Sequence, residues 1–237
     1  LANAEYFHNM SPWQWQRAII AGRLTGAPDY VHIAVERFKH YIAHRFYFDG
    51  FWMEPSVHYH EQSGYSAFKD NIFPYLAGYS DSEAYASPYG SKTYASFDPE
   101  KSFGSFVPAI RRSFEKAHYP DGRCVPLGDT FMFTTNAKYA LEQPSYLQAG
   151  VGHAALCGDM NGNQVQAHIA WTPKTGHWHF DTLGISVWAN NREIISDLGY
   201  THTAYKPWMR GNVSHNLVVV DYKSHDYEKH LRGNIIY

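Results

Sequence analysis

Three side chains that can bind a metal ion or move a proton lie two residues apart in one short segment. They are His177, His179 and Asp181. If this segment is extended, the alternation of a strand places all three on one face. Imidazole and carboxylate groups placed in this way serve as zinc ligands or as acid–base groups. The chain has fifteen histidines, so close pairs also arise by chance, and the spacing alone leaves ordinary packing open.

The segments that follow predict a hairpin. Residues 184–189 and 192–197 have the composition of strands, and the polar pair Asn190-Asn191 between them is typical of a two-residue turn. Such a hairpin would return Asp197 toward the histidines.

A third extended segment supplies one more candidate ligand. His215 directly precedes residues 217–221, which are strongly β-prone. His179, Asp197 and His215 would then come from three neighbouring extended segments. Two imidazoles and one carboxylate are a ligand set that suits zinc.

A second cluster of reactive side chains lies earlier in the chain. Tyr59 stands between His58 and His60, shortly after a turn at Asp49-Gly50. A tyrosine beside cationic or polar groups can act as a base or an acid. The alternative is that Tyr59, one of nineteen tyrosines, simply packs on a helix.

The elements that must position these residues change in type along the chain. We expect helices at residues 13–24, with Ser11 as N-cap and Pro12 in the first turn, from Asp29 onward, and at 64–76 and 103–118. Residues 77–100 read as a loop that faces a substrate. Strands are expected at 164–171, 184–189, 192–197 and 217–221. Helices followed by strands favour two layers or domains over an alternating α/β fold.

Composition excludes some partners. With 237 residues, 18% charged residues and a formal net charge of −2, the chain has no global field for nucleic acid or membranes. No apolar run approaches the ~20 residues of a membrane span. The aromatic content of 17% fits either packing or the recognition of sugar rings. Cys124 and Cys157 could pair or stay reduced. The chain begins at Leu1 and stops within a strand-like pattern, so we expect a piece of a longer protein.

Four motifs together resemble the heparinase II/III-like polysaccharide lyases, which include alginate and oligoalginate lyases. The first is Asp49-Gly50 with Glu54 and Tyr59-His60. The second is the Gly176–Asp181 segment GHWHFD, the third is Asp197-Leu198-Gly199, and the fourth is Arg210 followed by His215-Asn216. Residues 120–122 and 126–129 also resemble the family's segment between its two modules.

The resemblance implies an α+β multidomain fold. Residues 1–140 would be the C-terminal part of an (α/α) toroid, and residues 141–237 the start of an antiparallel β-sandwich. The reaction implied is β-elimination at a uronic acid, with Tyr59 as acid, and Tyr59 or His177 as base. The metal, a structural zinc, would be held by His179, Asp197 and His215, with Asp181 fixing the segment behind them.

The substrate-binding residues implied are less sharply matched. The family's Asn-His pair at the start of an earlier helix has only an inverted match here, His8-Asn9, which read alone is a capping segment. Asn9 would neutralise the substrate carboxylate. His8, His60 and Arg210 would contact the substrate, although Arg210 could equally form a salt bridge within the sandwich.

The resemblance also implies the setting of the protein. The partner would be an anionic polysaccharide or oligosaccharide, and the location periplasmic or secreted. Two alternatives remain open: a uronate epimerase or carbohydrate-binding relative with the same fold, and a zinc hydrolase. The hydrolase signature His-x-His-x-Asp continues with a further His, whereas Thr182 stands at that position here.

Overall fold

The structure, a computed structural model, describes residues 7–82, 85–88, 93–131, 143–224 and 226. The chain forms two compact units. The first consists of Leu1–Phe46 and Glu61–Arg111, and the second of Tyr47–His60 and Arg112–Tyr237. The domain boundary predicted at residues 140/141 lies outside the described residues.

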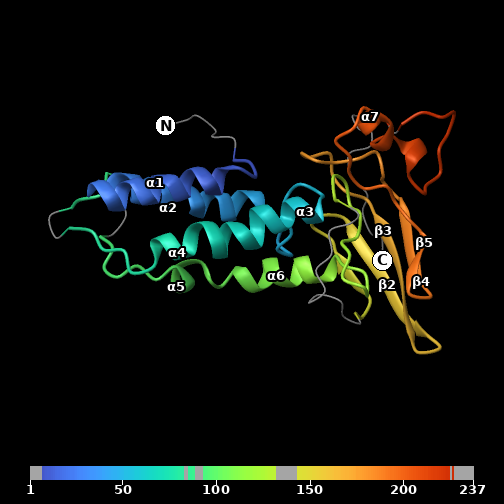
Figure 1. The fold of residues 1–237 in the computed structure, drawn as a ribbon, viewed down its shortest axis with the longest axis horizontal. Coiled ribbons are helices and arrows are strands. Elements are labelled where there is room, and N and C mark those ends of the chain that lie inside the picture. The colour runs from blue at the N-terminus through green and yellow to red at the C-terminus, as the bar shows by residue number, and fades with distance from the viewer. Residues whose placement is uncertain (1–6, 83–84, 89–92, 132–142, 225, 227–237) are drawn as a thin grey trace. The chain divides into compact units, whose positions relative to one another are not determined.

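The first unit is helical. Helix α1 (Ser11–Thr25) and helix α2 (Pro28–Arg45) lie side by side (Figure 1). Their facing sides carry aromatic residues, and the ring centroids of Trp15 and Tyr41 are 5.2 Å apart. Phe38 from α2 meets Phe68 and Phe103 edge to face, at 4.8 and 5.0 Å. This aromatic core stabilises the unit by removing large apolar surfaces from water.

The helix ends differ from those predicted. Ser11 is the first helical residue of α1, whose N-cap is Met10, and the Ser11 hydroxyl accepts the His8 N–H. The Ser11 cap prediction was therefore wrong. Asp29 likewise lies inside the first turn of α2, where its charge favours the helix N-terminus, while Ala27 is the N-cap.

The helix predicted at residues 64–76 is confirmed, because residues 61–76 are helical without a gap, whereas the helix predicted at 103–118 is interrupted. The π-helical segments Glu61–Tyr65 and Ala67–Ile72 lead into α4 (Phe73–Leu76). Helix α5 (Pro99–Phe103) is capped by Asp98, and a turn at residues 104–106 separates it from α6 (Val107–Lys116), whose last residues belong to the second unit.

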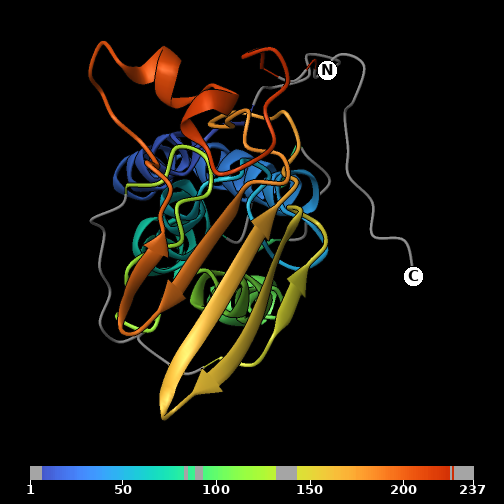
Figure 2. The same cartoon turned by 90° about the vertical axis from the view of Figure 1, so that its right-hand side faces the viewer.

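The second unit contains the short helix α3 (Val57–His60) and a five-stranded antiparallel sheet (Figure 2). The strands pair in chain order, which is a simple meander. They are β1 (Tyr146–Gln148), β2 (His153–Met160), β3 (Asn163–Ala170), β4 (Ile185–Ala189) and β5 (Arg192–Ile195). Helix α7 (Lys206–Met209) and the 3₁₀ turn Asn212–Ser214 follow. The coarse prediction of helices followed by antiparallel strands is confirmed.

The β4–β5 hairpin was predicted correctly, and the last strand was not. Asn190 and Asn191 both have positive φ, as a type I′ turn requires. Residues 217–221 form no strand, so the strand prediction there was wrong. His177 is likewise in a turn and not in a strand, and the strands β1 and β2 were missed.

One face of the sheet buries polar residues. The rings of His153 and His168 stack, and the His153 Nε2 lies 3.1 Å from the His168 Nδ1. The Gln148 Oε1 lies 3.0 Å from the His153 Nδ1, and the Gln166 Oε1 lies 3.0 Å from the His168 Nε2. All four side chains are nearly inaccessible to solvent. The other face is apolar and includes the exposed Leu156, Ile185 and Ile195.

Neither cysteine forms a disulfide. Among the described helices, none combines the length and the apolar character that crossing a membrane demands.

Candidate active site

Tyr59 is positioned by a tight segment that begins at Asp49. The Asp49 carboxylate accepts the N–H groups of Phe51 and Gly150, at 3.2 and 2.9 Å. The Trp52 N–H donates to the Nδ1 of His60, 2.9 Å away. These hydrogen bonds fix the turn before α3. The Tyr59 side chain, which projects from α3, is half-buried.

His177 lies in the loop between β3 and β4, in a strained conformation. Its φ is +61°, a left-handed conformation that a residue with a Cβ adopts only at a cost of about 1 kcal/mol. The Asp129 N–H donates to the His177 carbonyl at 2.9 Å and holds it there. The His177 side chain keeps 25% of its surface exposed, so a ligand can reach it.

The structure brings Tyr59 and His177 together. Their rings stack with centroids 3.5 Å apart and planes 14° from parallel. A phenol and an imidazole, both partly exposed, therefore present their polar atoms at one place, as a proton donor and a proton acceptor acting on one substrate must.

Two buried carboxylates flank the His177 ring. Asp129 lies 3.0 Å from Nδ1, and Glu54 lies 3.8 Å from Nε2. Glu54 is held by the indole N–H of Trp52 at 2.9 Å. A Cβ at Gly176 would clash with the Glu54 carboxylate, so glycine at this position permits the close approach. The imidazole therefore has a carboxylate near each of its ring nitrogens.

Asp129 is held ionised. Burial alone would raise the pKa of its carboxyl, but hydrogen bonds from His177 and His179 and the charge of Lys206 hold that pKa well below its usual range. The Lys206 ammonium lies 3.6 Å from the carboxylate and donates to the Tyr200 hydroxyl at 3.1 Å.

Tyr59 is held protonated. Burial raises the pKa of its phenol to about 12, helped by Tyr200, Asp129 and Glu54. At neutral pH the free phenol therefore keeps its proton, which suits a proton donor.

The three predicted zinc ligands gather in one buried cluster. His215 Nδ1 lies 2.6 Å from an oxygen of Asp197, and the rings of His179 and His215 are 5.3 Å apart. Burial alone would lower the pKa of His215, but Asp197 raises it. Asp181 is buried beside them, and burial raises the pKa of its carboxyl.

This donor set fits zinc chemically. Two imidazoles and a carboxylate are present, and the buried Nε2 of His215 has no hydrogen-bond partner among the described residues. Within the described part of the chain, however, no three His, Cys, Asp or Glu side chains converge as a formed metal-binding group. The geometry is a hydrogen-bonded pair with a neighbouring imidazole.

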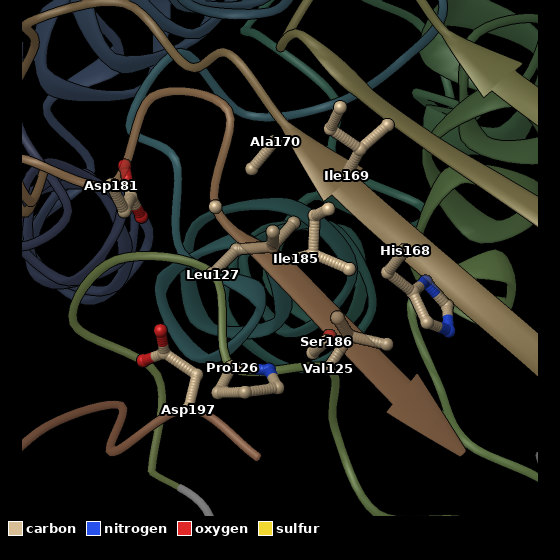
Figure 3. Close-up of a pocket in the computed structure, with 11 residues that line it drawn as sticks. Val125, Pro126, Leu127, His168, Ile169, Ala170, Asp181, Ile185, Ser186 and Asp197 are labelled. Carbon is tan, nitrogen blue, oxygen red and sulfur yellow. The ribbon is translucent and has the colours of Figure 1, made fainter. Parts of the chain in front are cut away.

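A small pocket adjoins this cluster. It is lined by eleven residues, with Asp181 and Asp197 toward one side and His168 toward the other (Figure 3). Its volume of about 20 Å³ is room for one water molecule and far too small for a sugar ring.

The other predicted site residues have local partners. The Arg210 Nε donates to the Trp178 carbonyl at 3.0 Å, and its guanidinium lies over the Trp178 ring. His60 is fully buried and stacks on Phe51. In the first unit, the Asn9 amide donates to the Gln62 side-chain oxygen at 3.3 Å. The His8 Nδ1 accepts the N–H of Met10.

Four polar residues of this site were not predicted as site residues: Glu54, which stands in the first motif, Asp129, Tyr200 and Lys206. Asp129 stands in the segment 126–129 that resembled the family's inter-module sequence, and this was the available signal. Tyr200 lies in an irregular segment and Lys206 begins the short helix α7, and no sequence pattern marks either residue.

The family described as "Heparinase II/III-like, C-terminal" matches residues 159–235. Solved structures share the fold. A heparinase III gene product is 16% identical with a TM-score of 0.70, covering 95% of this chain and 39% of its own. The heparan sulfate lyase HepC from Pedobacter heparinus is 16% identical with a TM-score of 0.65, covering 93% and 38%. Another heparinase III is 17% identical with a TM-score of 0.68, covering 93% and 40%.

These findings confirm the resemblance to the heparinase II/III-like polysaccharide lyases. The chain spans about two fifths of the length of the solved structures. No curated protein matches it in sequence.

Proposed function

We propose that this chain is part of a polysaccharide lyase that cleaves a uronic-acid-containing polysaccharide by β-elimination. The observation that carries the proposal is the stacked pair of Tyr59 and His177, at 3.5 Å between ring centroids, with Asp129 and Glu54 on either side of the imidazole. The relatives named as heparinase III and heparan sulfate lyase add to its support.

In the proposed reaction, His177 removes the C5 proton of the uronate. The electron pair of that C–H bond forms the C4–C5 double bond as the C4–O4 bond breaks. Tyr59 gives its proton to the departing O4. The protonated state of the free Tyr59 phenol favours this division of roles over Tyr59 as base.

The substrate carboxylate must be neutralised before its C5 proton becomes acidic. We assign this to Asn9, whose amide can hydrogen-bond the developing dianion. His8 and Arg210 are proposed substrate contacts. His60 is a weaker candidate, since its ring is buried against Phe51.

We propose that His179, Asp197 and His215 hold a structural zinc ion. When bound, zinc would cross-link the loop carrying His177 to the segments after β5 and α7. Asp181 would then support this cluster from its buried position beside it.

The finer fold and the setting are proposals too. We infer that the helices of the first unit belong to an (α/α) toroid, and that the sheet belongs to a β-sandwich. The exposed Leu156, Ile185 and Ile195 support the sandwich, because a second sheet would cover this apolar face. A periplasmic or secreted protein would meet such a polysaccharide.

The test is product analysis with the full-length protein on heparan sulfate, heparin, alginate and chondroitin sulfate. A lyase forms an unsaturated uronate that absorbs in the ultraviolet, with one new reducing end per double bond. New reducing ends without a double bond would identify a hydrolase, and inverted uronates without cleavage an epimerase. No double bond from any of the four polymers would refute the proposal.

A further inference from the structure

The two oxygens of the buried Asp129 carboxylate lie within hydrogen-bond distance of two different histidines, for which we propose different roles. Oδ2 lies 3.0 Å from the Nδ1 of His177, and Oδ1 lies 2.8 Å from the Nε2 of His179. The Asp129 residue is 2% exposed. A single carboxylate therefore joins the proposed catalytic base to a proposed zinc ligand.

We propose that Asp129 is a positioning residue that fixes the ring tautomers of His177 and His179 together. This inference rests on the proposed function, in which the Nε2 of His177 takes the substrate proton. An ionised carboxylate can only accept hydrogen bonds, so each ring nitrogen facing it carries a hydrogen. A neutral imidazole carries one such hydrogen, so the lone pairs lie on the Nε2 of His177 and the Nδ1 of His179.

The two assignments are the ones that the proposed roles need. The Nε2 lone pair of His177 is on the side away from Asp129, where it can take up a proton. The lone pair of His179 is on Nδ1, and this is the atom through which that ring could bind a metal. If the tautomer of either ring were reversed, a ring hydrogen would occupy the working position.

The backbone around Asp129 is built to keep the carboxylate in place. The Ser56 hydroxyl donates to the Asp129 carbonyl at 2.8 Å. The Val57 N–H donates to the hydroxyl of Thr130 at 2.9 Å. Together with the hydrogen bond from the Asp129 N–H to the His177 carbonyl, these contacts join the start of the Tyr59 helix to the His177 loop.

An asparagine side chain has the same shape as aspartate but cannot fix both histidine tautomers. Asparagine offers one acceptor oxygen and one donor NH₂, so one of the two histidines must face a donor and take the opposite tautomer. If this is His177, its Nε2 carries the hydrogen and the ring cannot act as base. If it is His179, the Nδ1 carries the hydrogen and metal binding suffers.

The test is the Asp129→Asn variant of the full-length protein, with three measurements. If the new NH₂ faces His177, steady-state kinetics should show kcat lowered by about 10²- to 10⁴-fold with KM changed by less than about threefold, as expected for loss of a general base. If it faces His179, elemental analysis should show less bound zinc. Nitrogen-15 NMR of the histidine side chains at alkaline pH, assigned with His177→Gln, should show hydrogen on the Nδ1 of His177 in the wild type.

Asp81→Asn is the matched control. Asp81 is a buried aspartate of the first unit whose carboxylate lies 2.8 Å from the Nε2 of the buried His32. The control therefore removes the same kind of buried carboxylate–imidazole pair elsewhere, and should leave the His177 tautomer unchanged.

The NMR measurement needs neither substrate nor the Asp129→Asn variant. Hydrogen on the Nε2 of His177 in the wild type would overturn the inference, whatever the activity. An Asp129→Asn protein with both wild-type kcat and wild-type zinc content would overturn it as well. If the wild type shows the Nδ1 tautomer but cleaves no uronate polymer, the proposed function fails while the role of Asp129 in fixing the tautomer stands.

Discussion

Replacement of Gly128 by alanine should separate the segments that carry Tyr59 and His177. Gly128 has φ +47°, and a Cβ there would stand closer than 3.0 Å to the carbonyl oxygens of both Pro55 and His177. Both obstacles are backbone atoms, so no side chain can turn away to make room. The backbone of Gly128 must therefore move away from Pro55 and His177 by several tenths of an ångström, or theirs must move away from it.

The cost has two parts. A left-handed conformation costs alanine about 1–2 kcal/mol relative to glycine. Inserting a methyl group into filled space costs about a further 1–3 kcal/mol. Gly162→Ala isolates the first part, because Gly162 also has positive φ (+80°) and no atom lies within 4 Å of its Cβ position. Gly128→Ala should therefore destabilise the second unit by about 1–3 kcal/mol more than Gly162→Ala does.

The assay is the urea dependence of amide hydrogen exchange in peptides from β2 and β3, which reports on the second unit alone. Polymer cleavage is measured on the same samples. Gly128→Ala should also lower kcat under conditions where it is folded, because the Tyr59–His177 stack is displaced, and Gly162→Ala should not. Equal stability and equal activity of the two variants would refute the close approach at Gly128.

Two further predictions concern pH and metal. Burial lowers the pKa of His153 to about 3, and burial with the neighbouring His153 lowers that of His168 well below its usual value. The unfolded chain then binds the protons, so stability should fall as pH drops from about 6.5 toward 3, by up to about 1.4 kcal/mol per pH unit for each histidine. His168→Gln should flatten this slope in pH-dependent unfolding, and an unchanged slope would contradict the assignment. Chelation should remove zinc and lower the melting temperature of the full-length protein, and His215→Gln should abolish zinc binding while His202→Gln should not. Protein purified without zinc, with a melting temperature insensitive to the chelator, would contradict the metal proposal.

The reactive residues were easier to find from the sequence than the residues that hold them in place. Tyr59 and His177 stand in short motifs with fixed spacing, and the structure places their rings in contact. The strand alternation used to group His177 with His179 was nevertheless wrong, because His177 lies in a turn with positive φ. The two histidines are held together through Asp129, a long-range contact that no local pattern encodes.

The fold shows the same division between local and long-range information. The β4–β5 hairpin was predicted because Asn190 and Asn191 tolerate the left-handed turn. Strand β2 was missed because its buried face carries His153, a polar residue that hides the usual alternation of apolar and polar side chains. Residues 217–221 have strand propensity but no strand partner in the described sheet, and propensity without pairing does not make a strand.

The most direct test of the central claim is the turnover of Tyr59→Phe on whichever uronate polymer the wild type cleaves, followed by the absorbance of the new double bond. Tyr205→Phe, which changes an exposed tyrosine (73% exposed), is the control. Tyr59→Phe is expected to lower kcat by about 10²-fold or more, as loss of a general acid does, with KM little changed, while Tyr205→Phe should match the wild type. Wild-type turnover by Tyr59→Phe would contradict the claim that the phenol stacked on His177 delivers the proton.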